Sequence, residues 1–101
     1  MDTIMLARRI AAVIERNRID ISTEDAAHRA IRAALERDGI EAQSEVRLSP
    51  KERIDLMAGS VGIEVKVGHS RRAILAQLER YAALPEIAAL VLATGTAGHA
   101  A

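Results

Sequence analysis

The chain lacks cysteine, tryptophan and phenylalanine, and a single tyrosine is its one large aromatic residue. The absence of cysteine excludes disulfide bonds and thiolate chemistry, which is typical of proteins from a reducing cytoplasm. Because aromatic side chains are almost missing, the core must consist of Ile, Leu, Val, Ala and Met. Such a composition favours helices packed on a small sheet.

A long apolar run is also missing, since no segment approaches the roughly 18 residues that a membrane-spanning helix needs. Arg8 and Arg9 interrupt the first apolar residues too early for a secretory signal peptide. We therefore expect a cytoplasmic protein that does not insert into a membrane.

Net charge is absent as well, because 14 basic residues balance 14 acidic ones. This balance argues against a protein that holds nucleic acid by bulk positive charge, so a nucleic-acid role needs a local basic patch or bound cations. The length of 101 residues, half of them apolar, suits a single domain. We expect a packing helix and link over 1–21, a core over 22–94 and a frayed tail over 95–101.

Hydrophobic periodicity predicts three helices, over residues 2–17, 22–38 and 70–84. Ser22 followed by Asp25 fits a capping box at the start of the second helix, and Gly39 suits its C-terminal end. Ser70 is the expected N-cap of the third helix, in front of a segment that Pro85 closes.

Four further segments have the alternating or continuously apolar patterns of strands, over residues 45–48, 53–57, 61–67 and 87–93. The predicted order is therefore α-α-β-β-β-α-β. We expect a mixed α/β (α+β) fold in which a mixed sheet is flanked by helices, with one extra helix at the N-terminus.

The pair Gly59-Ser60 matches a two-residue hairpin turn between the second and third strands. A turn centred there places Asp55 directly opposite Glu64, with their Cβ atoms about 4.5–5.5 Å apart. Two adjacent carboxylates repel each other unless a cation lies between them, and such oxygen ligands suit Mg²⁺ or Mn²⁺. Lys66 follows on the same strand face, where it can neutralise charge or orient a water molecule.

The same register assigns Ile54 and Leu56 to a core face shared with Ile63. On the opposite face, Gly62 and Gly68 carry no side chains and are expected to leave room for a substrate beside the carboxylates. An ordinary solvated sheet face with casual ion pairs accounts for the same polar residues, and this interpretation stays open.

The third predicted helix adds further polar candidates. Gln77 lies at the margin of its apolar stripe, four residues before Tyr81, and a side-chain amide packed near a sheet needs a partner. The start of this helix offers free backbone N–H groups and cations, which suit a phosphate. The contacts to nucleic acid expected here come from His69, Ser70, Arg71, Arg72 and Tyr81.

Together these residues resemble the PD-(D/E)XK nuclease superfamily over roughly residues 22–94. Asp55 followed by Glu64-Val65-Lys66 after a hairpin is similar to the family's split Asp and Glu-x-Lys signature, although Ile54 stands where the signature has proline. The run from Gln77 to Tyr81 is similar to the Gln-x-x-x-Tyr motif of the exonuclease-like branches. The resemblance implies the restriction-endonuclease-like α-β-β-β-α-β core.

The resemblance also implies a set of roles. One or two Mg²⁺ or Mn²⁺ ions are expected on Asp55, Glu64 and the Val65 carbonyl, with Glu24 completing the shell and Glu45 as its rival. Lys66 is expected to position the attacking water, and Gln77 to help hold substrate or a metal-bound water. His28, on the same helix as Glu24, is interpreted as a half-buried helix histidine.

The expected function is that of a metal-dependent deoxyribonuclease that hydrolyses phosphodiester bonds. Because a small neutral chain offers little binding surface, we expect a homodimer or a partner protein that extends the contact with DNA. Endonuclease, exonuclease and junction-resolving activities are not distinguished by the sequence. Two alternatives remain, namely an inactive nuclease-fold module that binds nucleic acid or assembles complexes, and a small structural interaction protein.

Overall fold

The computed structural model describes residues 2–95, and the predicted frayed tail, apart from Gly95, lies outside them. The described residues form three helices and four strands in the predicted order α-α-β-β-β-α-β. None of these helices has the length and apolar character to cross a membrane. The elements are α1 (Thr3–Arg16), α2 (Glu24–Arg37), β1 (Gln43–Arg47), β2 (Arg53–Ala58), β3 (Val61–Val67), α3 (Arg71–Ala82) and β4 (Ala89–Gly95).

The helix starts are capped by short polar side chains. Ser70 caps α3 as predicted, since its hydroxyl accepts a hydrogen bond from the Ala73 amide at 3.1 Å. The prediction of Ser22 as the cap of α2 is wrong by one residue. Thr23 takes this position and accepts from the Ala26 amide at 3.1 Å. The backbone N–H of Ser22 donates instead to the Asp20 carboxylate.

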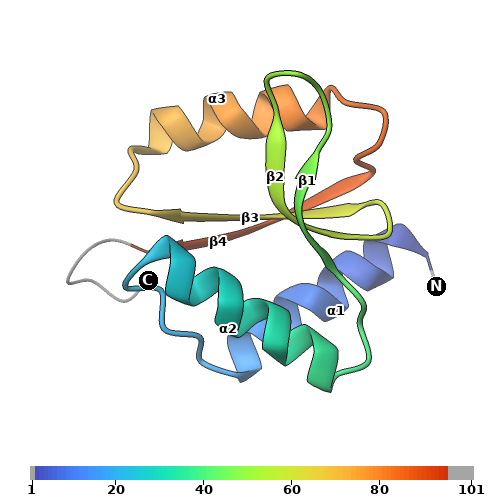
Figure 1. The fold of residues 1–101 in the computed structure, drawn as a ribbon, viewed down its shortest axis with the longest axis vertical. Helices are drawn as coiled ribbons and strands as arrows, with labels where there is room; N and C mark the ends of the chain where they lie inside the picture. Colours follow the sequence, from blue (N-terminus) through green and yellow to red (C-terminus); the bar gives the residue numbers. More distant parts are fainter. Residues whose placement is uncertain (1, 96–101) are drawn as a thin grey trace.

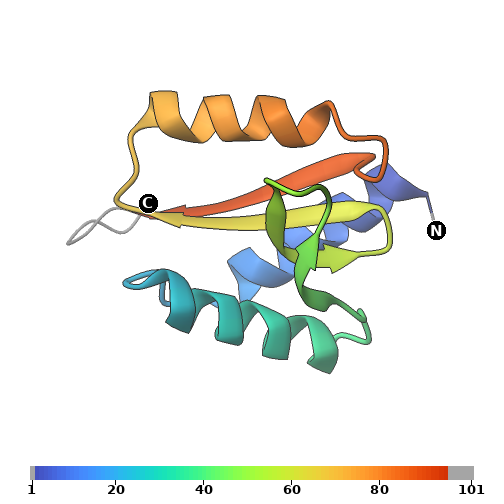
Figure 2. The ribbon, with the colours of Figure 1, turned by 45° about the horizontal axis from the view of Figure 1, so that its top comes forward.

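The four strands form one mixed sheet in the order β1-β2-β3-β4. β1–β2 and β2–β3 are antiparallel, whereas β3–β4 is parallel, with α3 as the crossover between them. Helices α1 and α2 cover one face of the sheet and α3 covers the other (Figures 1 and 2). This arrangement confirms the predicted mixed α/β class. β4 begins at Ala89 rather than at residue 87, because Ile87 closes a turn by donating to the Leu84 carbonyl.

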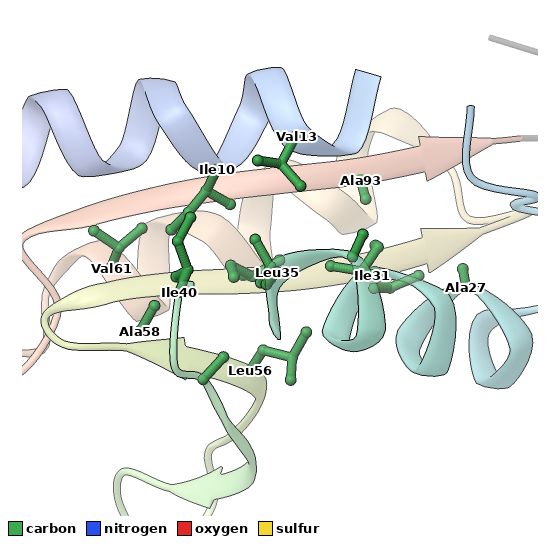
Figure 3. Packing of buried hydrophobic residues seen from close by; sticks show 14 residues of the cluster. Ile10, Val13, Ala27, Ile31, Leu35, Ile40, Leu56, Ala58, Val61 and Ala93 are labelled. Atoms are coloured by element: carbon green, nitrogen blue, oxygen red, sulfur yellow. The ribbon is translucent and has the colours of Figure 1, made fainter. Parts of the chain in front are cut away.

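The larger of two apolar clusters lies between the sheet and the helices α1 and α2 (Figure 3). It joins Ile10 of α1 and Leu35 of α2 to Ile63 and to Leu56, all without exposed surface. Both helices turn their stripe of apolar residues at helical spacing toward this cluster. The smaller cluster lies on the α3 side and consists of Ile54, Met57, Tyr81 and Ile87.

The alternation of side chains along β2 is interrupted at Asp55. Leu56 belongs to the larger cluster and Ile54 to the smaller one, so the prediction that they share a face is wrong. Across from this point, Glu45 of β1 has φ 55°, a left-handed conformation that strands do not otherwise use. The break inserts no residue, because Ser44 pairs with Leu56 on one side of it and Val46 with Ile54 on the other, in one unchanged register. It turns the β1–β2 hairpin over the sheet toward α3 (Figure 1).

Candidate metal centre

The β2–β3 hairpin has the register that its turn predicts. Gly59 has φ 59°, and the pairs that follow are Ala58 with Val61 and Leu56 with Ile63. Beyond Leu56 the regular ladder stops, because β2 bends away from β3 at Asp55. The predicted ladder pair of Asp55 with Glu64 is therefore not formed, although the two residues are still joined by hydrogen bonds from their side chains.

Side chains replace the backbone ladder at this break. The Asp55 backbone N–H donates to Glu64 Oε1 at 3.2 Å, and the Val65 N–H donates to Asp55 Oδ2 at 2.8 Å. Each carboxylate thus accepts a hydrogen bond from the strand that carries the other. This exchange holds two acidic groups next to each other although they repel, an arrangement that a bound cation would relieve.

Glu64 is the one charged residue that is fully buried in residues 2–95, with 2% of its surface exposed. Burial raises the pKa of its carboxyl from 4.5 to about 7, and the negative charge of Asp55 adds to this rise. The Lys66 ammonium, 3.6 Å from Glu64 Oε2, acts in the opposite direction. Near neutral pH the site therefore exchanges a proton readily at Glu64 while Lys66 supplies a nearby positive charge.

Helix α3 supports Glu64 through Tyr81. The Tyr81 hydroxyl lies 3.2 Å from Glu64 Oε2 and 3.0 Å from the Arg53 carbonyl oxygen, and it accepts from Gln77 Nε2 at 3.1 Å. Burial of the ring, followed by the Glu64 charge, raises the pKa of the Tyr81 hydroxyl. With 1% of its surface exposed, Tyr81 is not open to nucleic acid, so its predicted role in binding is corrected to support of Glu64.

A second group of potential ligands shares Asp55. Donor atoms of His28 (α2), Glu45 (β1) and Asp55 (β2) all lie within 4.8 Å of one another. His28 Nε2 is also 3.3 Å from the Ser44 hydroxyl, which orients the ring beside β1. An imidazole and two carboxylates are a donor set that fits Mn²⁺ and other transition metals. Asp55 therefore belongs to this group and is also hydrogen-bonded to Glu64.

Glu24, which the sequence suggests as the metal-binding acid, lies elsewhere. Its Oε2 atom is 2.9 Å from His69 Nε2, so it connects the start of α2 to the loop between β3 and α3. Glu45, its rival, is the acid that is placed beside Asp55. The sequence contains a weak signal for this outcome, because Glu45 and Asp55 are on adjacent strands. No local pattern indicates that His28 reaches them, since α2 must first pack on the sheet.

The remaining candidate residues lie at the start of α3. Ser70, Arg71 and Arg72 are exposed, and the Ser70 hydroxyl is engaged as the helix cap. They follow Lys66 by one short loop, in which Gly68 has φ 74°. The corner therefore has the positive charge expected there.

Gly62 does not leave space for a substrate, contrary to prediction. A Cβ atom at this position would lie 2.4 Å from Ile54 Cδ1 and 3.1 Å from Leu90 Cδ2. Glycine is needed here because Ile54 crosses to the α3 face and fills the volume above the strand. The close approach is internal packing and not a substrate groove.

Comparison of the chain with models of protein families, with curated proteins and with solved structures finds no match.

Proposed function

We propose that this protein is a metal-dependent nuclease that hydrolyses DNA phosphodiester bonds at the site around Asp55. The observation that carries the proposal is the position of Asp55, which is held at the break between β2 and β3 by hydrogen bonds to Glu64 and Val65. There it lies next to Glu64 on one side and within 4.8 Å of His28 and Glu45 on the other. A solvated sheet face does not need four potential metal ligands (His28, Glu45, Asp55 and Glu64) gathered around one point beside a lysine, so this arrangement supports a metal site.

The donor set fits a divalent cation. Asp55, Glu45 and His28 would hold it, and Glu64 and the Val65 carbonyl extend the set on β3. When bound, such a cation activates water and stabilises the charge that develops on a phosphate. The imidazole favours Mn²⁺ over Mg²⁺, because Mg²⁺ strongly prefers oxygen ligands.

The protein's own groups supply the remaining chemistry. The Lys66 ammonium, with 16% of its side chain exposed, donates hydrogen bonds to a water or phosphate oxygen beside Glu64. Without a bound cation the pKa of Glu64 is about 7, and the positive charge of a bound cation would favour its ionised form, which can act as a ligand. Gln77 and Tyr81 keep the Glu64 carboxylate in one orientation.

Substrate binding is assigned to the corner that follows Lys66. Ser70 and Arg72 place backbone N–H groups and a cation at the start of α3, where a phosphate is stabilised by hydrogen bonds and by the helix dipole. Because the chain has no net charge, most of the attraction for a DNA backbone comes from this corner and from the bound cation.

A cleavage panel tests the proposal. Wild type and Lys66→Ala are incubated with Mg²⁺ or Mn²⁺ and with linear, nicked, flapped or four-way DNA, and Lys51→Ala serves as the matched control on the exposed β1–β2 turn. We expect cutting by wild type and Lys51→Ala, and a loss of about 10²-fold or more in Lys66→Ala. Calorimetric titration with Mn²⁺ is run in parallel on wild type and Asp55→Ala.

The two measurements separate the alternatives. Binding of Mn²⁺ that Asp55→Ala abolishes, without cleavage of any substrate, identifies an inactive nuclease-fold module. Absence of both binding and cleavage favours a structural interaction protein and rejects the proposed site.

A further inference from the structure

Strand β4 forms one edge of the sheet, with α3 packed on one of its faces and α1 on the other (Figure 2). It pairs with β3 on one side, and within residues 2–95 no strand pairs with its other side. Its seven residues, Ala89–Gly95, include no charged side chain. The opposite edge, β1, is protected by charges at Glu45 and Arg47 and by the bend of the hairpin. An uncharged edge strand of this length is a template for pairing with another strand.

Helix α3 carries an exposed ridge on the β4 side. Tyr81 and Arg80 face the hairpin, because Tyr81 contacts the Arg53 carbonyl and Arg80 Nε lies 3.0 Å from Glu52 Oε1. Arg71 precedes Arg80 by nine residues, or two and a half turns, and therefore lies on the opposite side of the helix. Since β1–β2 and β4 are opposite edges of the sheet, this side of α3 faces the β4 edge (Figures 1 and 2).

The ridge consists of Arg71, Leu75 and Glu79, which are spaced four residues apart and share one face. Leu75 is one of the few large apolar residues exposed in the described chain, with 52% of its surface accessible. Arg71 and Glu79 are both exposed, and neither forms an ion pair within residues 2–95. All three residues line one shallow depression of the helix surface.

The charges of this ridge are complementary to those of an antiparallel copy of itself. About a two-fold axis at Leu75, each Arg71 meets the Glu79 of the other copy, and the two Leu75 side chains meet on the axis. A parallel arrangement places like charges together instead. Closed two-fold symmetry is the commonest form of self-association, and it requires a surface with this property.

One two-fold axis can relate both the two β4 strands and the two α3 ridges of a dimer. Helix α3 packs against β4 and reaches Glu64 of β3 through Tyr81, so it lies above these two strands. With strands about 4.8 Å apart, antiparallel pairing of two β4 strands brings the two α3 helices to about 10 Å. This is the usual separation of packed helices, about 8–10 Å.

We propose that the chain forms a two-fold symmetric homodimer through β4 and the Arg71–Leu75–Glu79 ridge of α3. The two sheets join into one across the β4 edges, and two Arg71–Glu79 ion pairs flank the Leu75 contact. Arg71 then serves the interface, whereas Ser70 and Arg72 stay available to substrate. The inference does not depend on the proposed nuclease activity.

Charge reversal and charge exchange test the dimer by sedimentation equilibrium over a wide range of protein concentration at low ionic strength. We expect Arg71→Glu and Glu79→Arg each to weaken dimerisation by about tenfold or more, because two attractions become repulsions. The double variant Arg71→Glu/Glu79→Arg should recover most of the affinity. Lys51→Glu, a matched charge reversal on the exposed β1–β2 turn, should dimerise like wild type.

Folding of every variant is checked by circular dichroism, and hydrogen exchange measures the β4 amides. These amides should be protected in the dimer and exchange faster in Arg71→Glu at the same concentration. The proposal is overturned by a wild type that stays monomeric at all concentrations. A dimer that Arg71→Glu and Lys51→Glu affect equally, or a double variant without recovery, also overturns it.

Discussion

The buried carboxyl of Glu64 should make the metal-free protein less stable as the pH rises. Its pKa is about 7 in the folded chain, against an ordinary value of 4.5. Between these two values the folded state binds more protons than the unfolded state, so the free energy of unfolding decreases with increasing pH. The stabilisation is complete below pH 4.5 and is lost as the pH passes through 7.

The substitution Glu64→Gln isolates this effect. One pKa unit corresponds to about 1.4 kcal/mol, so the rise in the pKa of Glu64 makes its ionisation in the folded state cost about 3 kcal/mol at pH 8. Glutamine matches the neutral acid in shape, and its oxygen can accept from the Asp55 N–H. Its amide nitrogen can donate to the Tyr81 hydroxyl, which then donates to the Arg53 carbonyl. The Asp55 amide, the Tyr81 hydroxyl and the Arg53 carbonyl therefore keep their partners, whereas the Lys66 ammonium loses the carboxylate oxygen 3.6 Å away.

Urea unfolding followed by far-UV circular dichroism, in EDTA between pH 5 and 8, measures the difference. We expect Glu64→Gln to lie within about 1 kcal/mol of wild type at the acidic end and to be more stable by about 3 kcal/mol at the basic end. The exposed Glu86→Gln serves as the control and should follow the wild-type curve. Other groups titrate in this range, but the comparison of the two curves removes their contribution.

A constant difference between wild type and Glu64→Gln across the pH range would refute the reasoning, because it would mean that Glu64 does not titrate between the two extremes. A more stable variant at high pH, combined with lost Mn²⁺ binding, is the expected sign of a functional residue retained at the expense of stability.

Two further predictions concern packing and the choice of metal. Gly62→Ala should destabilise the protein by about 1–3 kcal/mol in urea unfolding, because the new methyl group overlaps Ile54 Cδ1, and the added change Ile54→Val should recover part of the loss. No recovery in the double variant would contradict this. His28→Ala should weaken Mn²⁺ binding by about tenfold or more in calorimetry while affecting Mg²⁺ less, because it removes the nitrogen ligand. Equal losses for both ions would place His28 outside the metal site.

Local patterns predict the elements and the central hairpin correctly because their causes are local. Helical spacing, short polar caps and the Gly59 turn act within a few residues, and the turn alone sets the β2–β3 register. The errors at this level are small. Thr23 caps α2 in place of its neighbour Ser22, since either hydroxyl suits the position and the path of the preceding loop selects one.

The same distinction between local and tertiary causes applies to the site. Asp55 and Glu64 could be paired from the sequence, because one turn connects them, and Gln77 and Tyr81 were recognisable as a pair on one helix face. The sequence did not predict that Tyr81 supports Glu64, because the burial of Tyr81 depends on the packing of α3 over the bent strand β2. The same bend moves Ile54 to the α3 face and makes Gly62 a packing glycine.

The order of the elements, the mixed α/β class and the two adjacent carboxylates follow from the amino-acid sequence, because short-range geometry dictates them. The tertiary structure alone decided that Glu45 and His28, and not Glu24, lie beside Asp55. The reason is physical: these side chains belong to separate elements, and their distances depend on how α2 packs on the sheet and on the left-handed turn of β1 at Glu45. Neither is encoded within a few residues of the chain.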